Sequence, residues 1–185
     1  MFLKLEGRLC LVVGAGNVGE PKIESLVASG ARVRVVAPKA TPRVREWARD
    51  ARIEWQAREY APSDFAGVFL VIAATNSPSL HRDIYAEAQS RGVLCNSVDE
   101  PTRCDFYFPA VVRRGELQIA ISTGGLSPAL AQRLRMDLEQ QYGPEWEEWV
   151  AQLGRTRDEL KDIPMPPEQR KRLLHQYASL DPKPR

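Results

Sequence analysis

The sequence lacks the features that mark disulfide-stabilised, zinc-stabilised or membrane-spanning proteins. Its 185 residues include only three cysteines, Cys10, Cys95 and Cys104, without a Cys-x-x-Cys pair. Neither a disulfide framework nor a structural zinc site is therefore predicted. No apolar run approaches the ~18 residues of a membrane helix. The N-terminus has no apolar signal segment with a small-residue cleavage site. We expect a cytoplasmic protein with no membrane partner.

An excess of charge of one sign is also absent. The 26 Lys and Arg residues nearly balance the 24 Asp and Glu residues, which leaves a formal net charge of +2. Basic side chains therefore matter only where they cluster, and no nucleic-acid partner is predicted. The two histidines, His81 in a predicted surface helix and His175 in a C-terminal helix, are expected to be structural or exposed. Metal ligands stay unknown.

Short apolar runs alternate with amphipathic stretches in the first part of the chain. Residues 9–13 and 68–74 are apolar without polar alternation, which is typical of strands buried on both faces. Further strands are predicted over 32–37, 53–55 and 93–96, with helical stretches between them. Strands that alternate with helices at this spacing predict an α/β fold with a doubly wound, Rossmann-type parallel sheet.

After about residue 110 the pattern changes. Residues 106–112 and 117–122 read as two strands joined in a hairpin. Ser127-Pro128 then starts a helix, because serine caps a helix and proline suits its first turn. One hairpin and one helix bury too little surface for independent stability, so we interpret this segment as a dimerisation element. The expected divisions are a nucleotide-binding domain over 1–112, the dimerisation element over 113–143 and a C-terminal helical segment over 144–185.

A glycine-rich turn follows the first predicted strand. Gly14-x-Gly16-x-x-Gly19 has a buried strand before it, a helix after it and a second strand about 20 residues on, which is the context of a dinucleotide-binding turn. The first glycine permits the tight turn, the second lets a pyrophosphate approach the backbone, and the third lets helix pack on sheet. The helix N-terminus favours the anion. A purely structural glycine turn is the alternative.

The residues after the second strand do not indicate whether the chain binds NAD or NADP. An acidic residue there would bind the ribose of NAD, and a basic one would accept the extra phosphate of NADP. This chain has Ala37-Pro38-Lys39 instead. Lys39 could neutralise a phosphate or be an ordinary solvated lysine, so on these residues both cofactors stay open.

A carboxylate follows a later strand of the predicted sheet. Asp99 ends the stretch Asn96-Ser97-Val98-Asp99, at the carboxyl edge where α/β sheets bind ligands. A carboxylate among apolar neighbours can serve as proton donor or acceptor. Asp-Glu-Pro is also good turn chemistry, so an ordinary turn aspartate is the alternative. If Asp99 acts in chemistry, we expect it to share one cavity with the glycine turn.

Several stretches together resemble the precorrin-2 dehydrogenase family, which also forms the N-terminal module of bacterial siroheme synthase. The resemblance covers about residues 1–140, and its most specific piece is Ser-Thr-Gly-Gly-Leu-Ser-Pro. The chain departs from the family at Pro21, where arginine is frequent, and at Gly19, where alanine is frequent. The matching stretches are Gly14-Ala15-Gly16-Asn17-Val18 with Lys22, Ala73-Ala74-Thr75, Asn96-Ser97-Val98-Asp99, Cys104 to Ala110 and Ala120 to Ala131.

The resemblance implies an activity and a set of site residues. The implied activity is NAD-dependent oxidation of precorrin-2 to sirohydrochlorin, for siroheme or cobalamin synthesis, by a homodimer. Some members also insert Fe²⁺, and insertion of Fe²⁺ or Co²⁺ stays open here. Asp99 matches the aspartate central to the family's chemistry, and Ser122 matches a serine beside the substrate cleft. The cofactor positions are Gly14, Gly16, Asn17, Val18, Gly19, Pro38, Lys39 and Thr75, with NAD favoured, and the substrate positions are Ser122, Thr123, Gly124, Arg113 and Arg114.

Two other functions also agree with a glycine turn. A short-chain dehydrogenase needs a Tyr-x-x-x-Lys pair, but none of the five tyrosines has a lysine four residues on. A non-catalytic NAD-sensing module is the second alternative. Such a module would leave Asp99 and the Gly124-Gly125 break without a role, and NADH formation that depends on substrate would separate it from an enzyme.

Overall fold

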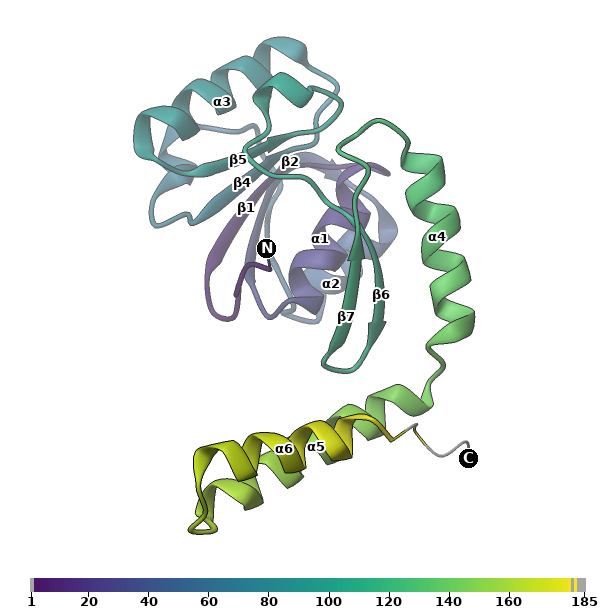
Figure 1. The fold of residues 1–185 in the computed structure, drawn as a ribbon. Helices are drawn as coiled ribbons and strands as arrows, with labels where there is room; N and C mark the ends of the chain where they lie inside the picture. The colour runs from purple at the N-terminus through teal and green to yellow at the C-terminus, as the bar shows by residue number, and fades with distance from the viewer. Residues whose placement is uncertain (1, 181, 183–185) are drawn as a thin grey trace. The chain divides into compact units, whose positions relative to one another are not determined.

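The computed structural model describes residues 2–180 and 182. The chain forms two compact units, of which the first ends at Tyr107 and the second begins at Phe108 (Figure 1). No helix in this described part of the chain is both long enough and apolar enough to cross a membrane. The two units are built in different ways, the first around a parallel sheet and the second from a hairpin and helices.

Unit 1 contains a five-stranded parallel sheet with the strand order β3-β2-β1-β4-β5. The central strand is entirely apolar where it is most buried, and Cys10, Leu11 and Val12 have no exposed surface. Such a run suits a parallel strand that is covered on both faces. The strands are β1 (Leu9–Ala15), β2 (Arg32–Ala40), β3 (Glu54–Gln56), β4 (Leu70–Ala73) and β5 (Leu94–Ser97).

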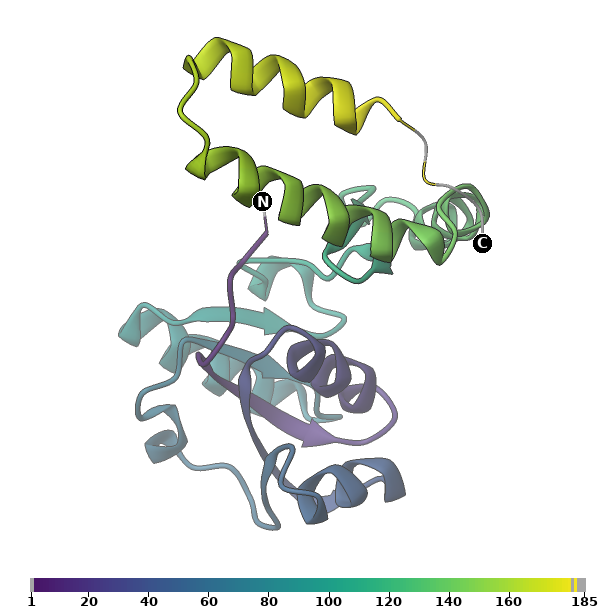
Figure 2. The same cartoon turned by 90° about the horizontal axis from the view of Figure 1, so that it is seen from below.

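Helices cover both faces of this sheet. Figure 1 and Figure 2 show α1 (Gly19–Ala28) and α2 (Pro42–Arg49) on one face and α3 (Pro78–Arg91) on the other. On the α3 face, Ile84 and Ala88 join the buried cluster that includes the strand residues. The Rossmann-type fold predicted from the apolar runs is therefore confirmed.

β2 is longer than the sequence pattern predicts. It continues beyond residue 37 as far as Ala40, which pairs with Ala15 after a register shift between Val13 and Ala15. The shift falls at Gly14, whose φ of +106° is a conformation that residues with a side chain rarely adopt. The extra residues bring the end of β2 alongside the glycine turn.

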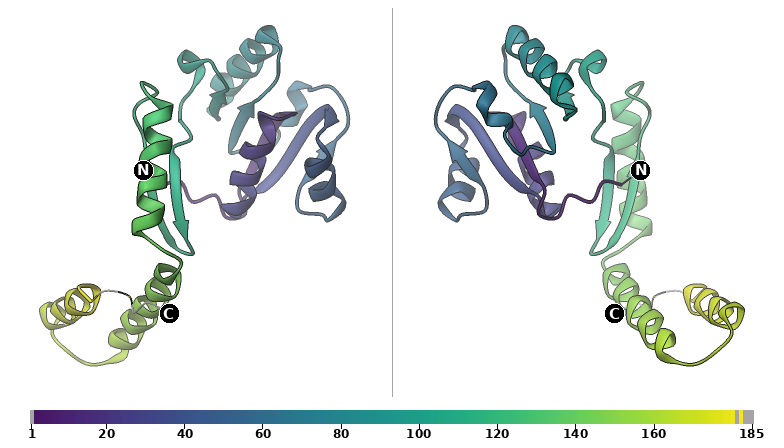
Figure 3. Two further views of the ribbon diagram at one scale, coloured as in Figure 1. Left: turned by 90° about the vertical axis from the view of Figure 1, so that its right-hand side faces the viewer. Right: turned by 90° about the vertical axis from the view of Figure 1, so that its left-hand side faces the viewer.

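Unit 2 begins with the predicted antiparallel hairpin. β6 (Ala110–Arg114) pairs with β7 (Leu117–Ile121), and α4 (Pro128–Gln141) packs beside them (Figure 3). Ser127 caps α4, since its hydroxyl accepts a hydrogen bond from the Leu130 N–H at 3.3 Å. The chain then forms α5 (Glu145–Asp162) and α6 (Pro167–Ala178), which lie side by side.

Candidate functional site

A cavity of about 710 Å³ lies at the carboxyl ends of β1, β2 and β4. Its volume is within the range of ~300–1,000 Å³ that small-molecule and cofactor sites occupy. The glycine turn forms one part of the wall, the end of β2 another, and the loop after β4 a third. Every predicted cofactor position except Gly19 lines it, namely Gly14, Gly16, Asn17, Val18, Pro38, Lys39 and Thr75.

The three glycines of the turn meet different surroundings. A Cβ atom on Gly14 would lie 2.2 Å from the Ala74 carbonyl oxygen, and one on Gly19 would lie 2.4 Å from the Gly14 carbonyl oxygen. These two glycines are required because backbone passes directly over them. A Cβ on Gly16 would meet nothing within 4 Å. Gly16 therefore leaves open space beside the backbone, as a bound pyrophosphate would require.

The start of α1 leaves backbone N–H groups without a side-chain cap. Val18 occupies the N-cap position and has no polar side chain, so nothing from that residue competes for the first turn. The Glu20 N–H is already used, since it donates to the Gly16 carbonyl at 2.9 Å. Pro21 has no N–H. The N-terminal end of this helix therefore suits an anion, although with one donor fewer than usual.

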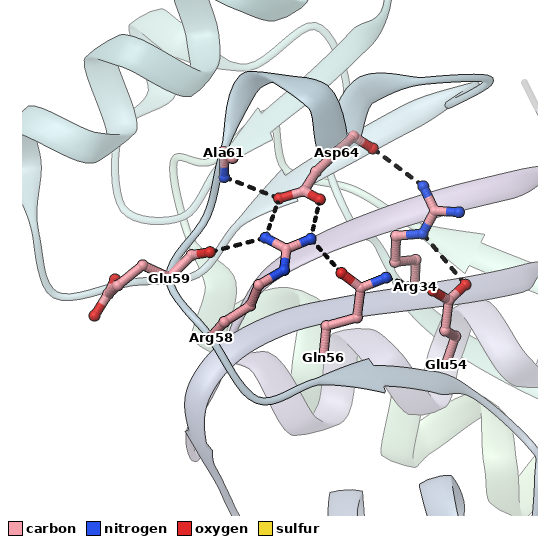
Figure 4. Close-up of polar contacts among 7 residues, drawn as sticks. All are labelled: Arg34, Glu54, Gln56, Arg58, Glu59, Ala61 and Asp64. Carbon is pink, nitrogen blue, oxygen red and sulfur yellow. Dashed lines mark hydrogen bonds and ion pairs between the residues drawn. The ribbon is translucent and has the colours of Figure 1, made fainter.

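The loop after β3 contributes Glu59 and Tyr60 to the cavity, and an ion pair between a half-exposed arginine and a buried carboxylate holds this loop in place (Figure 4). Arg58 Nη1 donates to Asp64 Oδ2 at 2.9 Å, and Arg58 Nη2 pairs with the other carboxylate oxygen. Asp64 is 4% exposed and also accepts the Ala61 N–H at 2.9 Å. Hydrogen bonding by Arg58 holds the pKa of Asp64 below its usual value, despite its burial.

Asp99 lies at the same edge of the sheet but does not line this cavity. It follows β5 with a φ of 64°, in the left-handed region that non-glycine residues rarely adopt. Its carboxylate is exposed and acts electrostatically on Lys22 in α1 and on His81 in α3. Burial lowers the pKa of Lys22, and the charge of Asp99 partly opposes that effect. Asp99 therefore does not share this cavity with the glycine turn, contrary to the expectation from the sequence, and acts only electrostatically on Lys22 in the helix that starts there.

The stretch Cys104-Asp105-Phe106 is hydrogen-bonded to both ends of the segment 96–97, which precedes Asp99. Asn96 Nδ2 donates to the Phe106 carbonyl at 2.8 Å, and the Cys104 thiol donates to the Ser97 carbonyl at 3.1 Å. Burial raises the pKa of the Cys104 thiol, so the thiol is neutral and acts as a donor. These contacts give this stretch a structural role beside the candidate catalytic carboxylate.

The two arginines expected to bind substrate differ in their surroundings. Arg113 is exposed on β6. Arg114 is directed to the end of α4, where its Nε donates to the Tyr142 carbonyl at 2.9 Å and its Nη2 to the Glu139 carbonyl at 3.1 Å. A cation at carbonyl groups of a helix C-terminus stabilises the helix. In this structure Arg114 therefore joins the hairpin to α4.

The remaining candidate substrate positions form the turn between β7 and α4. The Ser122 hydroxyl accepts the Gly124 N–H at 3.2 Å, and the Thr123 hydroxyl accepts the Ser127 N–H at 3.1 Å. Gly124 has a φ of +60° that makes this turn possible. Ser122 and Gly124 are exposed, so both face solvent at the start of α4.

Both parts of the chain match known protein families. Residues 1–110 match the family described as "Putative NAD(P)-binding", and residues 114–141 match "Sirohaem biosynthesis protein central". The solved structure of SirC, precorrin-2 dehydrogenase, has 27% sequence identity and a TM-score of 0.75, and the match covers 95% of this chain and 87% of that one. The chain belongs to the family described as "Putative NAD(P)-binding". The resemblance noted from the motifs is confirmed.

Siroheme synthases are further relatives of this family member. The Nitrosococcus oceani siroheme synthase is 42% identical over 147 residues, which is 77% of this chain and 31% of that protein. Siroheme synthase 1 of Yersinia enterocolitica is 41% identical over 161 residues, which is 87% of this chain and 34% of that protein. The chain thus spans about a third of the length of these relatives.

Motif analysis of this family member missed three residues near the cavity. Glu59 and Tyr60 line it from a loop without a recognisable motif. His81 lies in the predicted helix and is 5% exposed, so of the two expected alternatives, structural or exposed, it is the structural one. The loops after β4 and β5 cover His81, and no pattern in the sequence of the helix predicts this burial. No group of three or more His, Cys, Asp or Glu residues that could hold a metal occurs within residues 2–180 and 182.

Proposed function

We propose that this chain catalyses the NAD-dependent oxidation of precorrin-2 to sirohydrochlorin. The observation that carries the proposal is the cavity on the glycine turn, in a chain whose fold matches a precorrin-2 dehydrogenase over 95% of its length. The open space beside Gly16 and the uncapped start of α1 fit the pyrophosphate of a dinucleotide. When bound, NAD would take up the hydride, which leaves the chain to manage a proton.

Asp99 is our candidate for the proton acceptor. Oxidation of the macrocycle removes a hydride from a ring carbon and a proton from a neighbouring ring position. A base is therefore needed as well as the cofactor. Asp99 is an exposed carboxylate at the carboxyl edge of the sheet, and it interacts with Lys22 from the helix that starts at the glycine turn. The strained φ of 64° at Asp99 agrees with a functional role, because such strain gathers at active sites.

For unit 2 we propose two roles. Arg113 and the turn formed by Ser122, Thr123 and Gly124 would bind carboxylates of the substrate, which is a polycarboxylate macrocycle. The segment 113–143 would also form the interface of a homodimer. The support for an interface is the exposed apolar surface of Leu126, Leu130 and Leu134 beside and along α4.

The activity is tested by incubating the purified chain with precorrin-2 and NAD and following NADH and the sirohydrochlorin spectrum. We expect Asp99→Ala to lower kcat by about 100-fold, the low end of what a positioned acid–base group contributes. The Kd for NAD should stay near the wild-type value, because Asp99 does not line the cavity. The matched control is Asp158→Ala, which removes an exposed carboxylate from α5.

Two outcomes would contradict this proposal. Full activity of Asp99→Ala would remove that residue from the mechanism while leaving the dehydrogenase intact. Binding of NAD without any NADH formation would favour the non-catalytic NAD-sensing module. A parallel assay with sirohydrochlorin and Fe²⁺ or Co²⁺ tests metal insertion, and a rate equal to the protein-free control would leave oxidation as the only activity.

A further inference from the structure

His81 lies in the first turn of α3, between two loops that both belong to the candidate site. It is 5% exposed, although it lies within the first turn of a helix that covers the outside of the sheet. The loop on one side contains Thr75, which lines the cavity. The turn on the other side contains Glu100, which directly follows Asp99. A buried imidazole between two functional loops calls for partners on both ring nitrogens.

Both ring nitrogens of His81 have such partners. Nε2 accepts a hydrogen bond from the Thr75 backbone N–H at 3.2 Å. Nδ1 lies 3.5 Å from Oε1 of Glu100, close enough for an N–H to face that carboxylate. The second oxygen of Glu100 is taken by an ion pair with Arg103. The imidazole therefore connects the cavity loop to the turn that carries Asp99.

The contact with Thr75 defines the protonation state of His81. A nitrogen that accepts a hydrogen bond from a backbone N–H carries no proton, so the ring is neutral and its single proton is on Nδ1. Burial lowers the pKa of His81, which agrees with a neutral ring. The charged groups that face His81 are Glu100, Arg103 and Asp99. The positive charge of Arg103 opposes a second proton on the imidazole, and the negative charge of Asp99 favours one.

We propose that His81 is a positioning residue that ties the cofactor-lining loop at Thr75 to the turn carrying Asp99, and that it does so only as the neutral, Nδ1-protonated imidazole. The connection to catalysis rests on the function proposed above. The connection to the cavity does not, because it depends only on the hydrogen bond to Thr75.

The turn at Asp99 requires neighbouring contacts that hold its backbone conformation. Its φ of 64° is strained for a residue with a side chain, and strained conformations persist where neighbouring contacts over-determine them. His81 and Arg103 hold the side chain of Glu100, the next residue. Loss of His81 would release Glu100 on one side and leave the Thr75 N–H without its acceptor on the other.

The protonation state is tested first, on the wild-type protein without any substrate. The chain has two histidines, so a nitrogen-15 NMR spectrum of labelled histidine contains two rings, and His175→Gln identifies which signals belong to His81. We expect the Nδ1-protonated form of His81 near neutral pH. A proton on Nε2, or on both nitrogens, would overturn the proposal. Neither result depends on whether precorrin-2 is the substrate.

The effect on the cavity is tested by the pH dependence of NAD binding. As pH falls and Nε2 of His81 becomes protonated, the acceptor for Thr75 is lost, so the affinity of wild type for NAD should fall by about tenfold. His81→Gln has a side-chain oxygen in place of the acceptor and does not titrate, so its affinity should change little over the same range. The exposed-residue control, His175→Gln, should follow wild type. Identical pH profiles for wild type and His81→Gln would overturn the proposal.

The effect on Asp99 is tested by turnover of precorrin-2. His81→Leu removes both contacts, and we expect kcat to fall by about tenfold and the Kd for NAD to rise. Because His81→Gln keeps an acceptor for Thr75, it should recover NAD affinity more fully than kcat. If His81→Leu does not fold, the nitrogen-15 spectrum of wild type and the pH profile of NAD binding by His81→Gln still test the proposal. A wild-type kcat in folded His81→Leu would overturn the connection to Asp99.

Discussion

At the residue scale, Gly14 and Gly16 have different surroundings although they lie in the same turn. Gly14 combines a φ of +106° with a would-be Cβ contact of 2.2 Å to the Ala74 carbonyl oxygen. Gly16 has neither a strained φ nor any atom within 4 Å of its would-be Cβ. Gly14 is therefore needed for the fold itself, whereas Gly16 matters only when something occupies the open space.

This difference predicts separate effects of two substitutions. Gly16→Val should leave the thermal unfolding temperature close to wild type and weaken NAD binding at least tenfold, because the new side chain fills the space for the pyrophosphate. Gly14→Ala should destabilise the fold by about 2 kcal/mol or more, because it is strained at positive φ and clashes with backbone. Calorimetric titration with NAD and thermal unfolding measure the two effects. Normal NAD affinity in Gly16→Val would show that the cofactor does not approach this glycine.

At the element scale, the loop between β3 and β4 is held by ionic contacts as well as by the apolar packing of Phe65 and Val68. Its anchor is Asp64, which is bound by Arg58 through its side chain. Arg34 on β2 adds a bond from Nη1 to the Asp64 carbonyl at 3.3 Å, and its Nε pairs with Glu54 on β3 (Figure 4). These contacts connect the loop to the last two strands at this end of the sheet, and so place Glu59 and Tyr60 at the cavity.

Removal of the Asp64 charge should therefore destabilise unit 1 and change its pH dependence. We expect Asp64→Asn to lower the free energy of unfolding by about 1–2 kcal/mol near neutral pH, a value reduced because Arg58 is partly exposed. The pKa of Asp64 is depressed in the folded state, so its contribution is present above the ordinary carboxyl pKa of about 4 and is lost as pH falls through the folded value. Urea unfolding at several pH values measures this.

The exposed Asp50 offers a matched control for that experiment. Asp50 lies 3.6 Å from Arg49 in a solvated pair, and such pairs contribute little to stability. Asp50→Asn should therefore keep both the stability and the acid dependence of wild type. An acid dependence in Asp64→Asn equal to that of wild type would mean that the Arg58 pair does not stabilise the fold.

At the scale of the whole molecule, the apolar surface of unit 2 suggests self-association. Leu126, in the turn before α4, is 93% exposed, and Leu130 (44%) and Leu134 (38%) lie four residues apart on one side of the helix. Exposed leucines in such a stripe are costly in water unless a partner covers them. The partner proposed above is a second copy of the chain.

The oligomeric state should then respond to a single charge within this stripe. Light scattering after size-exclusion chromatography should report a dimer for wild type and a monomer for Leu130→Asp, since a buried unpaired carboxylate at an interface is strongly unfavourable. Gln140→Asp places the same charge at an exposed polar position of α4 and should stay dimeric. A monomeric wild type, or a dimeric Leu130→Asp, would contradict this interface.

The amino-acid sequence by itself determined the local features of this protein. Continuous apolar runs specified the buried strands, and the spacing of Gly14, Gly16 and Gly19 specified the turn that lines the cavity. Serine followed by proline marked the starts of α3 and α4, because Ser77 and Ser127 cap the first N–H groups. Each of these features depends on a few neighbouring residues, and so it can be recognised in a short stretch of sequence.

Only the tertiary structure decided how distant segments meet. It brought Glu59 and Tyr60 to the cavity, covered His81 with two loops, and directed Arg114 to the end of α4. No spacing predicts these outcomes, since they depend on contacts between residues far apart in the chain. A side chain's burial and hydrogen-bond partners are set by what folds over it, and that is a property of the assembled molecule.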